Sequence, residues 1–259
     1  MWPLTRQRDR RRFFSLSLWT PANLTSYVWL DAADASTITL NGSTVSQWAD
    51  KSGNGRNATQ VTAAYQPLYS ATAINNKAAI ITDGVDDALY VQSWGVISHP
   101  FTRVFVFNPV TMVVGKHYIN NQNPQPGGEF NVADNTNTSA MVQYAGATAN
   151  AVTTSANTNY IRISEFATTN SRVYTNGTVT GPANSGSIGL RGVCIGGYSL
   201  DGSGPVLNAC NARFGEVLVI PGVLSTDSRQ KLEGYLAWKW ALESSLPSGH
   251  PYKNRAPTQ

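Results

Sequence analysis

The sequence predicts an all-β protein in which one mostly-β sandwich domain is closed by a single C-terminal helix and preceded by a basic arm. Hydrophobic residues make up 41% of the chain and charged residues only 13%. Asn, Thr, Ser, Ala and Gly are abundant instead, and this composition favours exposed strands and turns. Short apolar runs bounded by turn residues occupy most of the chain, whereas a helical repeat occurs near its end. We expect residues 1–26 to form the arm and residues 27–259 to form one sandwich domain.

Strands are predicted wherever short apolar and β-branched runs end at turn residues. Residues 102–107 alternate most clearly, with two valines on one face and Arg103, Phe105 and Phe107 on the other. A similar run predicts a strand over residues 110–114. The other predicted strands cover residues 27–30, 45–48, 78–82, 88–91, 141–144, 160–166, 172–175, 178–180, 193–196 and 214–220.

An Asn-Gly pair predicts a hairpin between two of these strands. Asn176 and Gly177 separate residues 172–175 from residues 178–180. A two-residue type I′ turn needs a positive φ at both central positions, and Asn followed by Gly is the pair that tolerates this best.

Residues 214–220 form the best predicted core strand. Strict alternation would place Phe214, Glu216, Leu218 and Ile220 on one face and the intervening valines on the other. Glu216 is then a carboxylate in an apolar setting, and a buried carboxylate needs a partner. We therefore expect a structural hydrogen-bonding role for it.

One helix is predicted over residues 225–242. Ser225 is suited to the N-cap, because its side-chain oxygen can accept a hydrogen bond from a free amide of the first turn. Leu232, Leu236 and Trp240 then recur at the spacing of one helix face.

The arm accounts for the net charge of the chain. The first twelve residues hold five arginines and one aspartate, so they carry the whole +4, and the rest of the chain is neutral. Such an arm fits a tether to an acidic surface, either nucleic acid or a neighbouring protein, or simply a solvated terminus. An apolar run follows it but is too short and broken for a signal peptide, and no stretch approaches the ~20 apolar residues that span a membrane. The arginines are Arg6, Arg8, Arg10, Arg11 and Arg12.

The cysteines and histidines give no metal or catalytic pattern. Cys194 and Cys210 lie near apolar runs, so buried free thiols are expected, with a cross-strand disulfide as the alternative. His99, His117 and His250 have no metal-ligand spacing, and two of them precede a proline as loop residues do.

Carboxylates do not occur in the pattern that hydrolysis of a glycosidic bond requires. That reaction uses two carboxylates about 5–9 Å apart, and no predicted strand carries two on one face. The sequence also lacks a Gly-x-Ser-x-Gly nucleophile turn and a phosphate-binding glycine loop. We therefore expect a protein that is not an enzyme.

Two sets of residues are candidates for ligand binding. Asp83, Asp86 and Asp87 could supply oxygen ligands to a Ca²⁺ ion, although Asp side chains in such a loop also bond the local backbone. No other cofactor is predicted. Four aromatic residues near loops could stack on sugar rings or belong to the core: Trp94, Tyr118, Tyr144 and Tyr160.

Several motifs between residues 27 and 253 occur in a characteristic order. They are residues 29–34 (WLDAAD), 48–55 (WADKSGNG), 83–87 (DGVDD), 173–177 (VYTNG), 215–219 (GEVLV), 229–240 (RQKLEGYLAWKW), 246–247 (LP) and 250–253 (HPYK). Together they resemble the concanavalin A-like, laminin-G-like jelly-roll superfamily, in a version common in bacteriophage virion proteins and bacterial surface proteins.

This resemblance implies an antiparallel jelly-roll β-sandwich that binds glycans or proteins, sometimes with Ca²⁺. The glucanases of the superfamily carry a Glu-x-Asp-x-Glu strand motif, which this sequence lacks. An aspartate usually follows the last sandwich strand, where this chain has Pro221, so that position is expected to be a plain turn. Residues 1–26 lie outside the resemblance.

Three functions remain open. The first is a non-enzymatic virion structural protein of a capsid or tail, anchored by its arm to other virion subunits and present in many copies or as a homo-oligomer. The second is a carbohydrate-binding module in an extracellular setting or on a bacterial cell surface. The third is a polysaccharide-degrading enzyme with an unfamiliar site. None of them needs a membrane, and fold alone does not choose among them.

Overall fold

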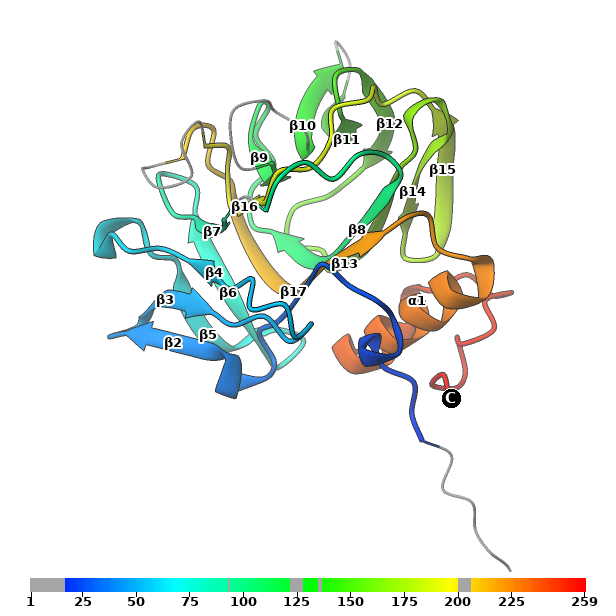
Figure 1. Cartoon of the computed structure of the whole chain (residues 1–259), viewed down its shortest axis with the longest axis horizontal. Coiled ribbons are helices and arrows are strands. Elements are labelled where there is room, and N and C mark those ends of the chain that lie inside the picture. The colour runs from blue at the N-terminus through cyan, green and yellow to red at the C-terminus, as the bar shows by residue number, and fades with distance from the viewer. Residues whose placement is uncertain (1–16, 93, 122–127, 135–136, 200–205) are drawn as a thin grey trace, which may run out of the picture.

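The computed structural model describes residues 17–92, 94–121, 128–134, 137–199 and 206–259. Within these ranges the protein is an all-β antiparallel jelly-roll sandwich with one α-helix near its C-terminus, as the sequence predicts (Figure 1). The strands are β1 (Val28–Asp31), β2 (Ile38–Asn41), β3 (Thr44–Trp48), β4 (Ala58–Thr59), β5 (Leu68–Ile74), β6 (Lys77–Asp83), β7 (Leu89–Val91), β8 (Phe101–Pro109), β9 (His117–Asn120), β10 (Gly128–Asp134), β11 (Asn137–Tyr144), β12 (Thr148–Thr153), β13 (Tyr160–Phe166), β14 (Ser171–Thr175), β15 (Thr178–Ala183), β16 (Val193–Ile195) and β17 (Asn211–Pro221). The helix α1 covers Thr226–Trp240, and short 3₁₀ turns cover Pro21–Asn23, Ala35–Thr37, Ala63–Tyr65, Thr168–Asn170 and Glu243–Ser245.

The ladders define two layers. One layer runs in the order β5-β6-β17-β8-β13-β14-β15, and β1 pairs with β17 beyond the end of β6. The other runs in the order β2-β3-β4-β7-β16-β9-β10-β11-β12. A pairing between β3 and β5 joins the two layers, so the whole ladder curls round on itself.

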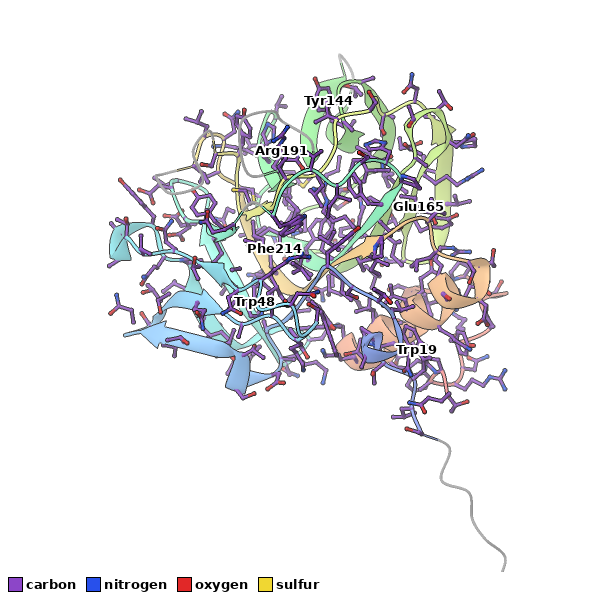
Figure 2. All side chains as sticks on the ribbon, in the orientation of Figure 1. Trp19, Trp48, Tyr144, Glu165, Arg191 and Phe214 are labelled. Carbon is purple, nitrogen blue, oxygen red and sulfur yellow. The ribbon has the colours of Figure 1, made fainter. Side chains whose placement is uncertain are left out.

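The main core fills the space between the layers. Trp48 from β3 and Phe214 from β17 are fully buried there, and Phe105 and Phe107 of β8 join them (Figure 2). Both faces of β8 are buried. The two phenylalanines point into the core between the layers, and the two valines on the opposite face pack against α1. The predicted division, with the two valines on one face and Arg103, Phe105 and Phe107 on the other, is therefore confirmed.

The helix packs on the outer face of the β17 layer. Leu232, Leu236 and Trp240 are fully buried against Val104, Ile163 and neighbouring apolar residues of that layer. The Ser225 hydroxyl accepts a hydrogen bond from the Ser228 amide, so the predicted N-cap is confirmed. The helix ends before residue 242, because Ala241 adopts a left-handed conformation with a φ of 53°.

A bulge in β17 overturns one prediction. Phe214 packs in the core between the layers, whereas Glu216, Leu218 and Ile220 face the helix. The register against β8 shifts at Gly215, where one extra residue is inserted and the alternation resets. A side chain at Gly215 would lie 2.6 Å from the Trp240 ring, so the close approach of helix and strand requires glycine here.

The strand predicted over residues 110–114 is absent. β8 ends at Pro109, and the chain then turns and leaves Val113 and Val114 almost half exposed. Several strands were not predicted, namely β2, β4, β5, β9, β10 and β12. The predicted hairpin is confirmed, because Asn176 and Gly177 have φ values of 48° and 80° between paired β14 and β15.

The part of the predicted arm that the structure describes packs on the body. Trp19 is buried beside α1, and its amide donates to the Pro257 carbonyl at 3.0 Å. The amide of Gln259 donates to the Ser17 carbonyl at 2.9 Å, so the two terminal segments run side by side (Figure 1). Contact with the body is therefore already present at Ser17, before residue 27, where the predicted domain begins. No described helix is long and apolar enough to cross a membrane.

Candidate functional site

The loop of residues 50–57 is built around one carboxylate. Asp50 Oδ1 accepts hydrogen bonds from the Trp29 and Ser52 amides, and Oδ2 accepts one from the Arg56 amide. Positive φ values at Gly53 and Gly55 let the chain turn tightly enough to surround that carboxylate. This internal bonding fixes the loop against the start of β1 and sets the position of Arg56.

Arg56 completes an aromatic platform with Tyr27 and Trp94. The two rings are stacked with an interplanar angle of 16° and centroids 6.4 Å apart. The guanidinium carbon of Arg56 lies 4.8 Å from the Trp94 centroid and 5.5 Å from the Tyr27 centroid. Both of these distances are well over half of the separation between the two centroids, so the guanidinium lies beside the ring pair rather than between the rings. All three side chains are partly exposed.

The Arg56 guanidinium keeps hydrogen-bonding capacity for a ligand. Nη1 donates to the Tyr27 carbonyl at 3.0 Å, and among the described residues no carboxylate lies within ion-pair distance of it. A guanidinium has five N–H donors in a planar fork that matches a carboxylate or a pair of hydroxyls. Each cation–π contact at an exposed site contributes about 0.5–1 kcal/mol, so the group is positioned before any ligand binds.

The four aromatic candidates do not form one site. Trp94 belongs to the platform. Tyr118 is fully buried, its hydroxyl donating to the Thr111 carbonyl, so its candidacy as a sugar-stacking residue was wrong. Tyr160 is partly exposed but packs on Phe107. Tyr144 lies at the end of β11, on the other side of the molecule from Trp19 (Figure 2).

Sequence reasoning missed Tyr27 and Arg56. Tyr27 was predicted as the first residue of a strand. Arg56 directly follows a glycine-rich turn, which was interpreted only as a loop. The signal that could have found them is the basic residue directly after a Gly-Asn-Gly turn, in a chain with few charges.

The acidic loop is a second candidate. Carboxylate oxygens of Asp83, Asp86 and Asp87 lie within 4.8 Å of one another, close enough to share one cation. The predicted backbone bonding is also present, since Asp83 accepts from the Val85 amide and Asp87 from the Asp83 amide. Burial, followed by the charge of Asp83, raises the pKa of Asp87 to about 7.

Glu216 has the partners that its burial predicts. Oε1 accepts from the indole Nε1 of Trp29 at 2.8 Å, and Oε2 accepts from Trp240 Nε1 at 2.9 Å and Lys239 Nζ at 2.8 Å. Lys239 also pairs with Asp31 at 2.6 Å. Burial raises the pKa of Glu216, and the Lys239 ammonium acts in the opposite direction. The group therefore joins helix and sheet.

A second buried carboxylate, Glu233 of α1, joins the helix to the loop that contains His250. Glu233 is fully buried and accepts from both the Arg229 guanidinium, at 2.7 Å, and His250 Nε2, at 3.0 Å. The Arg229 guanidinium lies 4.0 Å above the Tyr174 ring. His250 thus has a structural role. The cysteines are buried and free, as predicted.

The remaining candidates lie elsewhere. The arm residues Arg6, Arg8, Arg10, Arg11 and Arg12 lie outside the described residues. A pocket of about 310 Å³ lies between the N-terminal segment, α1 and the C-terminal segment, and none of its lining residues belongs to the platform.

Comparisons with known proteins identify the fold. No family model matches the sequence, and no curated protein is similar to it in sequence. Among solved structures, Trypanosoma rangeli sialidase in complex with sialic acid is 13% identical with a TM-score of 0.55, covering 83% of this chain and 33% of the sialidase. The chain thus spans about a third of that protein.

Two further structures are similar over most of this chain. Domain 4 of a GH43 extracellular arabinanase from Geobacillus stearothermophilus, in complex with arabinotriose, is 10% identical with a TM-score of 0.56, covering 78% of this chain and 94% of the domain. The binding domain of botulinum neurotoxin serotype D is 11% identical with a TM-score of 0.53, covering 79% of this chain and 49% of that one. At these identities the comparisons show a shared β-sandwich fold.

Proposed function

We propose that this chain is a non-catalytic carbohydrate-binding domain and that Tyr27, Arg56 and Trp94 form its glycan-binding platform. The observation that carries the proposal is the Arg56 guanidinium, which is held beside two stacked, partly exposed rings without an ion-pair partner among the described residues. Aromatic faces stack on the apolar faces of sugar rings, and a preformed donor fork beside them bonds hydroxyl or carboxylate oxygens.

The similar structures support this proposal. The arabinanase domain matches over nearly its whole length and was solved with arabinotriose. The likeness supports carbohydrate binding in general and leaves the identity of the sugar to experiment, because the shared identity is 10%.

The use of carboxylates supports a non-catalytic domain. Glycosidases need two carboxyl groups about 5–9 Å apart beside an open site. Here three of the buried acids, Asp31, Glu216 and Glu233, bind cations or indole groups inside the protein. Asp50 is occupied by backbone amides of its own loop.

A glycan array followed by calorimetry tests the proposal. Arabinotriose and an acidic oligosaccharide are natural first probes, because Arg56 could bond either a hydroxyl pair or a carboxylate. We expect saturable binding that weakens at least about tenfold in Arg56→Gln and in Trp94→Ala, as when a hot-spot contact is lost. Tyr144→Ala is the matched control, since Tyr144 is also partly exposed but lies outside the platform. Absence of binding to every glycan, or full binding by both platform variants, would reject the proposal.

A structural role in a virion is the second candidate function. The observation that favours it is the fixed attachment of Ser17 and Trp19 to the C-terminal segment, which gives the basic arm a defined point of origin on the body. Such an arm would bind a capsid or tail subunit, and the protein would act in many copies. Deleting residues 1–16 leaves Trp19 in place and should abolish incorporation into particles while the domain stays folded. Normal incorporation of the truncated chain would exclude this role.

A further inference from the structure

Arg56 brings a positive charge to the aromatic platform, and no described carboxylate pairs with it. The contacts with the Trp94 and Tyr27 rings fix its guanidinium at 4.8 Å and 5.5 Å from their centroids. Within the described part of the chain, the guanidinium makes one hydrogen bond, to the Tyr27 carbonyl at 3.0 Å. A guanidinium has five N–H groups, so the other four remain for a ligand.

Acidic residues are scarce around the platform in the sequence. No Asp or Glu occurs in residues 10–30, 51–82 or 88–128, the stretches that contain Tyr27, Arg56 and Trp94. The acid nearest to Arg56 in the sequence is Asp50, whose oxygens accept three backbone amides and the Ser52 hydroxyl. One of those amides is that of Arg56 itself, so Asp50 binds its backbone rather than its guanidinium.

The charge of the neighbouring Lys51 is compensated inside the protein. Its ammonium pairs with Asp31 at 3.0 Å and with Asp34 at 2.7 Å. Arg56 is therefore the cation of this loop that is left with donors for a ligand. A ligand carboxylate would supply the counter-charge that the described protein groups do not.

The platform offers mainly hydrogen-bond donors. A guanidinium and an indole carry no acceptor, and among the three side chains only the Tyr27 hydroxyl can accept. The hydroxyls of a neutral sugar donate as well as accept, so this set would use only part of their capacity. An ionised carboxylate only accepts, and its bonds to a guanidinium are about twice as strong as bonds between neutral groups. The donor set therefore favours an acidic sugar over a neutral one.

We propose that the ligand of the platform is an acidic glycan that contains hexuronic acid units, an inference that rests on the proposed carbohydrate binding. The ring of one unit stacks on Trp94 or Tyr27, and its carboxylate binds the Arg56 fork. The planar guanidinium matches a carboxylate through two parallel N–H···O bonds. Stacking holds the sugar and the ion pair selects the acid, so the two contributions can be measured separately.

Calorimetric titration of the full chain with matched acidic and neutral oligosaccharides tests the proposal. The probes are trisaccharides of galacturonic, glucuronic and mannuronic acid, each compared with its methyl ester, which keeps the sugar rings but removes the charge. We expect at least one acid to bind at least about tenfold more tightly than its ester, because the ester loses the charge-assisted contact. Raising NaCl from about 0.05 M to about 0.5 M should weaken binding of the acid and leave binding of the ester unchanged.

Four variants separate charge from stacking. Arg56→Gln should lower the affinity for the acid to that for its ester. Arg56→Lys keeps the charge without the fork and should give an intermediate affinity. Trp94→Ala should weaken acid and ester alike, because stacking does not need the carboxylate. Arg255→Gln is the matched control, since it removes the same charge from an exposed arginine outside the platform and should keep the preference of the parent protein.

The possible failures of this inference differ from a failure of carbohydrate binding. Equal affinity for every acid and its ester, or tighter binding of a neutral glycan, would overturn the inference while carbohydrate binding stands. A preference for acids that persists in Arg56→Gln would also overturn it. So would tighter binding of a sulfated oligosaccharide than of any carboxylated one. Binding to no glycan at all would reject the proposed function itself.

Discussion

Trp29 and Glu216 are 187 residues apart in the sequence and are joined by a hydrogen bond of 2.8 Å inside the protein. Trp29 lies on β1 and Glu216 on β17, and these strands pair with each other. The same carboxylate accepts from Trp240 and Lys239 of α1. One acidic group thus links two strands and the helix, next to the apolar cluster that packs α1 on the sheet.

Replacing Glu216 should destabilise the fold strongly. Glu216→Ala leaves two buried indole N–H groups without their acceptor and removes one of the two carboxylates that pair with Lys239, which keeps Asp31. Breaking a buried pair in this way costs about 3–5 kcal/mol. Glu216→Gln should cost less, because its amide oxygen still accepts one of these bonds. Urea unfolding measures both, with Glu243→Ala as the control at a partly exposed site. A loss in Glu216→Ala no larger than in the control would contradict the role assigned to this carboxylate.

The burial of Glu216 was predictable from the sequence, but its partners were not. A carboxylate within an apolar strand must find donors, and this argument needs only local pattern. Trp29, Lys239 and Trp240 reach it through tertiary packing, which alternation does not encode. The prediction that Phe214 shares a face with Glu216 failed for a similar reason. A bulge moves every later residue to the opposite face, and a single glycine is the only sign of it in the sequence.

Gly215→Ala should be destabilising by about 1–3 kcal/mol, the usual cost of overpacking a core. The added methyl would lie 2.6 Å from the Trp240 ring, which is fully buried and cannot withdraw. Gly249→Ala is the matched control, because a methyl there meets no atom within 4 Å. Thermal or urea unfolding gives the comparison.

A double-mutant cycle identifies the cause. Trp240→Phe removes part of the indole ring and should recover some of the stability lost in Gly215→Ala, so the two changes should be less than additive. Additive losses would show that Gly215 acts through backbone conformation rather than through contact with Trp240.

The strands were predicted correctly where at least one face of the strand is apolar. β8, β13 and β17 are strongly apolar, and their central pairing follows from that pattern. β5 was missed because its sequence, LYSATAI, is exposed or partly exposed up to its last residue and gives no periodic signal. The candidate site was predictable only in part. Trp94 was found by residue type. Arg56 and Tyr27 come next to it only through the fold of the loop around Asp50, which local sequence patterns do not encode.

The cysteines should be unreactive in the native protein. Cys194 and Cys210 are almost completely buried, and burial raises the pKa of both thiols, that of Cys210 to about 12. Only a thiolate attacks a disulfide reagent, so neither should be modified until the protein unfolds. Adding a thiol-specific reagent with and without urea provides the measurement. Rapid labelling of either cysteine under native conditions would show that the sheet opens locally around β16.

Asp87 should make stability depend on pH. Burial and the neighbouring Asp83 raise its pKa from 3.8 to about 7 in the folded state, so the folded protein binds the proton more tightly than the unfolded chain does. Stability from this group is therefore present below about pH 4 and is lost as the pH rises through about 7. Asp87→Asn removes the penalty of the buried charge, and its stability relative to the parent protein should be greater near about pH 8 than near about pH 5. Urea midpoints at the two pH values, with exposed Asp227→Asn as the control, make the comparison. Parallel pH dependences of the parent and Asp87→Asn would contradict the raised pKa.

Added Ca²⁺ gives a second test of the same loop. A urea midpoint that rises with Ca²⁺ in the parent but not in Asp87→Asn would show that Asp83, Asp86 and Asp87 bind a cation.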